Sequence, residues 1–184
     1  MIPELIIDIF RYYARFVPKS VLDRLFIQPA ASRLPGYDQL RAEVMALPAA
    51  RELPDLDTFV VSINENFVSE RIKNAAGFIL FVEYGAFSLD HTVAEGVVEQ
   101  LAVTVVRNFS DTNNDSINEL ILMNRCFELL DTILQTMVAD QADIDFCDGS
   151  LIEQPVKVQP VDPASFYGCG GWVAMFQKTN TILV

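Results

Sequence analysis

One apolar segment, Phe78–Tyr84, limits the possible folds of this chain more than any other part of its sequence. Its letters are FILFVEY, so both faces of a strand formed from it would be almost entirely apolar. Such a strand is typical of the centre of a sheet or of a sheet covered on both faces. In a second segment, Val97–Asn108, strand alternation places Leu101, Val103 and Val105 on one face. Together the two segments predict a long antiparallel pair around which the other elements pack.

Further strands are expected before and after this pair. Residues 58–63 form a short run of β-branched and aromatic side chains, which favours a strand. Whether it pairs directly with the next strand stays open, because residues 64–76 show no clear pattern. Near the C-terminus, short apolar runs flank Pro155, which suits an edge strand or a bulge. A glycine-rich turn over residues 166–171 then leads into a final strand from Trp172.

The polar stretch over residues 110–116 is the clearest boundary in the chain, and it precedes a long helix. Ser116 and Glu119 have the spacing of a capping box, in which each side chain accepts a hydrogen bond from the other residue's backbone. The helical pattern then continues to about Ala139. The side chains predicted to share one apolar face are Ile117, Leu120, Ile121, Phe127, Leu130, Leu134, Met137 and Val138. Those predicted to line the opposite, polar face are Asn118, Arg125, Glu128, Asp131 and Gln135.

The N-terminal third of the chain predicts a helical arm. Residues 2–27 carry large apolar side chains at helical spacing, and Pro18 divides them into two helices. The connection that follows contains four prolines and one short helical pattern. We therefore expect an α+β fold with an antiparallel or mixed sheet of about four to five strands, one long helix across a face and the N-terminal helical arm. The arm with its proline-bearing connection covers residues 1–57 and the α+β core residues 58–184, within a single domain overall.

Charge and hydropathy narrow the classes of partner. The formal net charge of -12 repels phosphate backbones, and the basic residues form no local patch, so no direct nucleic-acid binding is expected. No apolar run reaches the length of about 20 residues that spans a bilayer. The N-terminus has neither a basic leader nor a small-residue cleavage site, so we expect no membrane association and no secretion by a signal peptide. The three cysteines, Cys126, Cys147 and Cys169, are too widely spaced for a zinc set and predict free thiols in a reducing compartment.

The sequence offers no convincing catalytic group. A Ser-His-Asp or Cys-His site would have to use His91, the single histidine, which is expected in a loop next to Asp90. No GxSxG motif is present. Pairs of carboxylates such as Glu95 and Glu99, or Glu65 and Glu70, are available for acid–base chemistry. Nothing in the sequence brings either pair into a pocket, so no catalytic residue is predicted.

Metal and phosphate sites are also not predicted. Residues 111–115 match the first oxygen ligands of an EF-hand loop, but Ser116 stands where glycine is needed and Leu122 where a glutamate is needed. Acidic side chains gather after the long helix at Asp140, Asp143, Asp145 and Asp148, and an exposed acidic loop is the simpler interpretation. The glycines of residues 168–171 precede a strand and not a helix, so they favour a turn over a phosphate cradle. We therefore expect no cofactor and no metal.

The aromatic load of the arm is the remaining candidate for function. The arm either packs on its own sheet or docks on a neighbouring subunit. The residues that we single out as possible interaction sites are Phe10, Tyr13, Phe16, Leu25, Phe26 and Trp172.

The order of elements resembles that of the small structural proteins at the head–tail junction of tailed bacteriophages, the tail-terminator and tail-completion proteins. The residues that carry the resemblance are the segments Phe78–Tyr84 and Val97–Asn108, the helix from Ile117 to Val138, and Gly170-Gly-Trp172 at the start of the last strand. Members of this family form rings that cap the tail tube and join it to the head. The resemblance implies assembly through protein contacts and implies no catalytic residue.

Three hypotheses of function follow. The first is a non-enzymatic phage or prophage structural protein, found in the virion or the bacterial cytoplasm, that forms a homo-oligomer. The second is a cytoplasmic adaptor that binds a protein partner through the aromatic arm. The third is a cation-dependent enzyme of unfamiliar type that uses the acidic residues 140–148.

Overall fold

A computed structural model describes residues 5–62, 72, 75–90, 96–110, 115–141, 150–152 and 154–181. Within these residues the chain forms one six-stranded sheet with helices packed against it, which confirms the predicted α+β class. The strands are β1 (Leu56–Ser62), β2 (Phe78–Asp90), β3 (Gly96–Asn108), β4 (Ser150–Ile152), β5 (Lys157–Val161) and β6 (Cys169–Thr181). Their order is β1-β2-β3-β6-β4, and β5 also pairs with β6.

Three strands of 13 residues each, β2, β3 and β6, form the centre of the sheet. β2 and β3 pair antiparallel as predicted, from Phe78 opposite Arg107 to Asp90 opposite Gly96. β6 runs antiparallel to β3 along its whole length. β1 pairs parallel with β2, which answers the question that the sequence left open and makes the sheet mixed.

The outer edge of β6 is occupied by two short strands in succession. β4 pairs with residues 178–180 of β6 and β5 with residues 171–175, so together they form one interrupted edge row. Pro155 lies between the two pieces, as the sequence predicted for an edge strand or bulge. Because proline cannot donate a hydrogen bond, Pro155 and Pro160 also make this edge a poor template for another strand.

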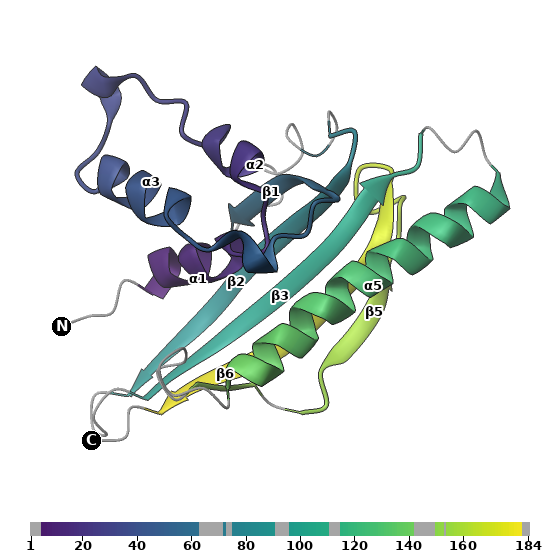
Figure 1. Cartoon of the computed structure of the whole chain (residues 1–184). Helices are drawn as coiled ribbons and strands as arrows, with labels where there is room; N and C mark the ends of the chain where they lie inside the picture. The colour runs from purple at the N-terminus through teal and green to yellow at the C-terminus, as the bar shows by residue number, and fades with distance from the viewer. Residues whose placement is uncertain are drawn as a thin grey trace.

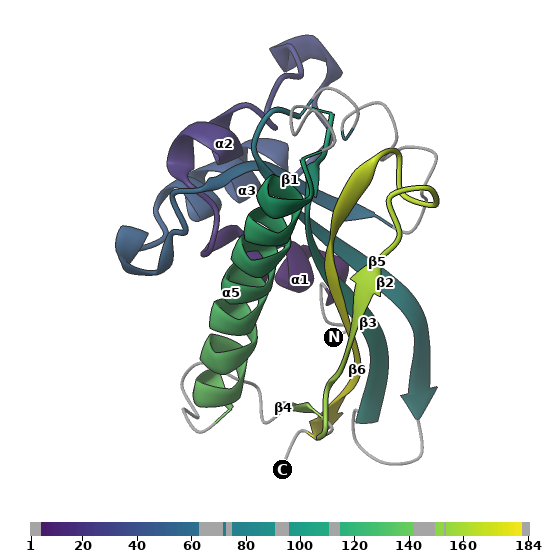
Figure 2. The same cartoon turned by 90° about the vertical axis from the view of Figure 1, so that its right-hand side faces the viewer.

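The helices α1 (Leu5–Ala14), α2 (Lys19–Asp23), α3 (Tyr37–Met45) and α5 (Ser116–Asp140) all lie on one face of the sheet (Figures 1 and 2). α5 crosses β3 and β6, whereas α2 packs near β1. Two single 3-10 turns, η1 (Ala30–Ser32) and η2 (Ala49–Arg51), interrupt the connections of the arm. The N-terminal arm and the long helix therefore share one layer.

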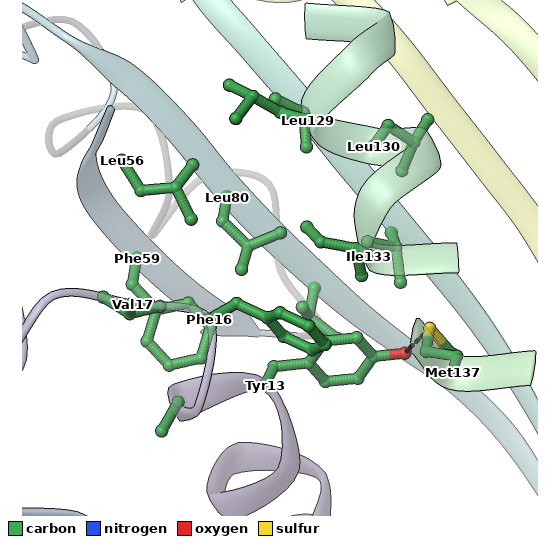
Figure 3. Close-up of a cluster of buried hydrophobic side chains, with 14 of the residues drawn as sticks. Tyr13, Phe16, Val17, Leu56, Phe59, Leu80, Leu129, Leu130, Ile133 and Met137 are labelled. Carbon is green, nitrogen blue, oxygen red and sulfur yellow. Dashed lines mark hydrogen bonds between the residues drawn. The ribbon is translucent and has the colours of Figure 1, made fainter. Parts of the chain in front are cut away.

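A single hydrophobic cluster fills the space between the sheet and this layer (Figure 3). It joins the arm, through Tyr13 and Phe16, to the sheet, through Leu80, and to α5, through Leu130 and Ile133. Successive side chains of a strand point to opposite faces of the sheet, so a second, smaller cluster forms on the face away from the helices. That second cluster consists of Val60, Ile72, Ile79, Phe81, Val106 and Cys169.

The structure corrects two predictions about α5. Its N-cap is Asp115 and not Ser116, because the Asp115 carboxylate accepts hydrogen bonds from the backbone N–H groups of Ile117 and Asn118. Its buried face is also rotated from the predicted one. The residues buried on α5 are Cys126, Leu129, Leu130, Ile133, Met137 and Asp140. Of the predicted face, Ile117, Leu120, Ile121, Phe127 and Val138 are exposed instead.

Candidate interaction surfaces

The predicted interaction residues of the arm all contact other parts of the same chain. Tyr13 and Phe16 are almost completely buried in the main cluster. The Phe10 ring stacks on Phe59 of β1, with ring centroids 5.4 Å apart, and meets the Phe26 ring edge-on at 6.4 Å. Leu25 is partly buried against the same cluster. Of the two arrangements considered from the sequence, the structure therefore has the arm packed on its own sheet.

Trp172 is held in a similar way at the start of β6. Its indole Nε1 donates a hydrogen bond to the backbone carbonyl of Met123 in α5, at 3.0 Å. Its ring meets that of Phe127 edge-on, with centroids 5.4 Å apart. Trp172 thus fixes the distance between α5 and the sheet and leaves only part of its surface to solvent.

A buried polar contact ties the arm to the end of α5. The Asp140 side chain is only 4% exposed, and its Oδ2 accepts from the Tyr12 hydroxyl at 2.8 Å and from Arg51 Nη1 at 2.7 Å. Next to it, the Tyr13 hydroxyl lies 3.6 Å from Met137 Sδ (Figure 3). A carboxylate near a helix C-terminus is unfavourable by itself, so the Arg51 cation offsets the cost of placing Asp140 there.

The structure describes only some of the residues that the sequence offered for catalysis or metal binding. His91, Glu95, the acidic residues 143–148 and the EF-hand-like positions 111–114 lie outside the described residues. The part of the chain that the structure describes contains no group of three or more His, Cys, Asp or Glu side chains that could hold a metal ion. Asp115, the last acidic residue of the EF-hand-like stretch, caps α5.

Two of the three cysteines are buried free thiols, Cys126 and Cys169. Burial raises the pKa of Cys126 to about 12 and the pKa of Cys169 to about 11. Since the thiolate is the nucleophile, both side chains are held in their unreactive form at neutral pH. Cys147 lies outside the described residues.

The glycine-rich turn before β6 has a structural use. Gly168 has a φ of +79°, which a turn requires and which other residues rarely adopt. Gly171 faces the backbone of β3 so closely that a Cβ atom would collide with the carbonyl oxygen of Val105. Gly168 thus lies in the turn expected from the sequence, whereas Gly171 lies inside β6, which begins at Cys169 and not at Trp172 as the sequence predicted. The missing side chain of Gly171 lets β6 approach β3 next to Trp172.

An open hollow of about 470 Å³ lies over the central strands. The residues around it are Glu83, Gly85, Gln100, Leu101, Ala102, Pro155, Met175, Phe176 and Gln177. Among these lining residues Glu83 alone is ionisable, so the hollow brings no second acid, base or nucleophile to a bound molecule. Its described lining thus combines one carboxylate with the amide side chains of Gln100 and Gln177.

Two surface patches stand out because they expose large apolar side chains. The first, which we call the α5 outer patch, consists of Ile117, Leu120 and Ile121, which are 61%, 65% and 61% exposed. The second, which we call the projecting loop, covers residues 27–36 between α2 and α3 and exposes Ile27 by 73% and Leu34 by 78%. Neither Ile27 nor Leu34 was among the interaction residues predicted from the sequence, although an isoleucine and a leucine in a proline-rich stretch were a visible signal.

The two patches lie far apart on the molecule. In Figure 1 the loop with η1 projects at the upper left, and the N-terminal end of α5 lies at the right. In Figure 2, viewed from the right-hand side, α5 lies in front of the arm. A partner that covers one patch would therefore leave the other exposed.

The fold and these surfaces define a class: an α+β protein whose mixed sheet carries a single helical layer and whose most exposed large apolar side chains, among the described residues, lie in the α5 outer patch and the projecting loop. Comparison with protein-family models, curated proteins and solved structures found no match to this chain. No helix in the described ranges combines the length and the hydropathy needed to cross a membrane.

Proposed function

We propose that this chain is a non-enzymatic structural protein of a phage or prophage that works by assembling into a homo-oligomer at the tail or head–tail junction. It would then be found in the virion or, before assembly, in the bacterial cytoplasm. The observation that carries the proposal is the exposure of Ile27, Leu34 and the α5 outer patch. Single exposed apolar residues are ordinary, but Ile117, Leu120 and Ile121 are neighbours on one face of α5, and such groups mark contact surfaces.

The element order supports the phage part of the proposal. The hairpin β2–β3, the helix α5 and the strand β6 follow one another as in the tail-terminator and tail-completion proteins that the sequence resembles. The net charge of -12 fits a ring through which DNA passes, since an acidic lumen repels the phosphates instead of binding them.

Size-exclusion chromatography with light scattering tests the proposal directly. The chain has a mass of 20.6 kDa, so an assembly would elute at a defined multiple of that value. A mass of 20.6 kDa at all concentrations up to the millimolar range would contradict assembly. The phage assignment has its own check, because genes for capsid, portal or tail-tube proteins should flank the gene of this protein.

A protein-binding adaptor is the second candidate, and the projecting loop favours it. The aromatic side chains of the arm contact the chain itself, so a partner would meet Ile27 and Leu34 first. An adaptor of this kind would be monomeric alone and would form a complex of two different chains. The light-scattering experiment therefore separates the two candidates.

A further inference from the structure

We propose that the open hollow over the central strands binds a short peptide through the charges at both of its ends. Neither candidate function uses this surface, so the proposed site goes beyond them. The hollow has a volume of about 470 Å³, within the range of about 300–1,000 Å³ that is typical of sites for small molecules.

The hollow lies on the face of the sheet away from the helices. Alternation along β3 places Ala102 on the same face as Val106, which belongs to the smaller hydrophobic cluster. Glu83 of β2 and Met175 of β6 share this face, because each lies opposite Ala102. None of the residues of that cluster lines the hollow, so the hollow opens beside the cluster.

A row of four side chains crosses the strands at this place. Glu83 of β2 is opposite Ala102 of β3, and Ala102 is opposite Met175 of β6. Lys157 of β5 is opposite Met175 and continues the row by one strand. The row therefore has a carboxylate at one end, an ammonium group at the other and two apolar side chains between them. Three strand spacings of about 4.8 Å separate the backbones at its ends by about 14 Å.

A second row, made of amide side chains, lies beside the first. Gln100 of β3 is opposite Gln177 of β6, two residues along the strands from Ala102 and Met175. Gly85 of β2 belongs to this row, because a Cβ atom there would lie 3.3 Å from the Cβ atom of Gln100. The two amides are thus about 7 Å along the strands from the apolar pair, where they can reach the backbone of a peptide that covers the first row.

These groups together select a dipolar molecule of defined length. Glu83 accepts hydrogen bonds from an ammonium group, Lys157 donates to a carboxylate, and the glutamine amides do both with peptide groups. An extended peptide advances by about 3.4 Å per residue, so about three or four residues connect the two charged side chains. A single amino acid is too short to reach both. A polyamine has no anion for Lys157, and Glu83 repels the phosphates of a nucleotide.

Both charged side chains can bind a ligand. Lys157 is exposed, and it takes part in none of the ion pairs among the described residues. Glu83 already interacts within its own chain. A carboxylate has about four lone-pair sites, so Glu83 can accept from an ammonium group and keep that interaction. Because Glu83 is half-buried, water weakens its attraction to a cation less than at a fully exposed site.

Isothermal titration calorimetry with tetra-alanine as the probe tests the proposed site. The peptide with free ends should bind at low ionic strength, where salt screens the charges least. Acetylation removes the ammonium group of the peptide and amidation removes its carboxylate, so each change should weaken binding about tenfold. Dialanine, which is too short to span the row, should lose a similar factor. Absence of binding up to the millimolar range, or equal binding of the peptide with both ends blocked, would contradict the proposal.

Charge reversals in the protein locate the two ends of the peptide. Lys157→Glu and Glu83→Lys should each weaken the binding of tetra-alanine about tenfold or more. Glu128→Lys, an exposed charge reversal on α5, is the matched control and should leave binding unchanged. The double variant Glu83→Lys with Lys157→Glu should restore binding, because the peptide then lies in the opposite direction. Where circular dichroism shows that Glu83→Lys does not fold, Glu83→Gln replaces it, and acetylation of the peptide should then weaken binding no further.

The possible failures have different meanings. A loss on amidation without a loss on acetylation would leave only a carboxylate site at Lys157 and would overturn the dipolar ligand. A folded double variant that does not bind would show that the two charges do not act as a pair, which also overturns the proposal. An equal loss for Glu128→Lys would assign the binding to net charge alone. The oligomeric mass that tests the proposed function changes none of these outcomes, so the two proposals fail independently.

Discussion

Asp140 ties the N-terminal arm to the end of α5 through buried polar contacts. Its Oδ2 receives hydrogen bonds from Tyr12 in α1 and from Arg51 in η2, and its side chain has almost no contact with water. One carboxylate therefore connects three elements that are distant in sequence. A charged group in such a place is stabilising only while its partners are present, because removing them leaves a buried charge.

Replacing Asp140 by alanine should lower the free energy of unfolding by about 2–4 kcal/mol, since two hydrogen bonds to a charged group are lost. Tyr12→Phe should cost less, about 1–2 kcal/mol, because it removes one bond and keeps the ring. Urea denaturation of both single variants and of the double variant measures the coupling between the two residues. The double variant should cost clearly less than the sum of the single variants; strict additivity would show that the contact contributes nothing.

At the scale of single elements, the start of α5 has two possible N-cap residues, Ser116 and Asp115. A serine followed three residues later by a glutamate predicted a capping box at Ser116. The preceding residue, Asp115, competes for the same backbone N–H groups, and its carboxylate carries a charge that the helix N-terminus favours. Asp115 therefore becomes the N-cap and Ser116 the first residue of the helix.

Asp115→Ala should consequently destabilise the chain by about 1 kcal/mol, the usual cost of losing an N-cap. Ser116→Ala is the matched control and should change the stability by a few tenths of a kcal/mol, because serine and alanine differ little inside a helix. Thermal unfolding followed by circular dichroism at 222 nm measures both. Equal losses, or a larger loss for Ser116→Ala, would restore the capping box predicted from the sequence.

The rotation of α5 shows what a helical pattern leaves undecided. Apolar side chains occupy more than one side of this helix, so Leu130 and Met137 were predicted correctly as buried while Ile117 and Leu120 were not. Period alone indicates that a helix is amphipathic, but here two overlapping apolar faces compete. Packing against the sheet buries the face that contains Cys126, Leu129 and Ile133. Apolar side chains on the other face, such as Ile117 and Leu120, stay exposed and form the candidate interaction surface.

At the scale of the whole molecule, the sequence predicted the antiparallel pair β2–β3, the long helix and the interrupted edge at Pro155. It could not predict that β1 pairs parallel with β2, because pairing direction depends on the path of a connection without a clear pattern. The candidate interaction surface was harder to predict from the sequence than the fold. Aromatic side chains such as Phe16 suggested a contact surface, but large side chains also stabilise a core when they are buried. Which of them is exposed follows only from the packed structure.

The packing of the arm leads to the last prediction, which concerns the integrity of the fold. Deleting residues 1–26 removes Tyr13, Phe16 and Leu22, which are at most 2% exposed, and opens the face of β1 and β2. Each such side chain contributes about 1.5–3 kcal/mol by burial, so their joint loss is comparable with a domain's total stability of about 5–15 kcal/mol. The truncated chain should unfold globally or aggregate.

Replacing residues 29–35 by glycine and serine is the control and should leave a cooperative thermal transition, because η1 and its flanks are largely exposed. A truncated chain with the same cooperative transition would instead make residues 58–184 an independent domain with a detachable arm.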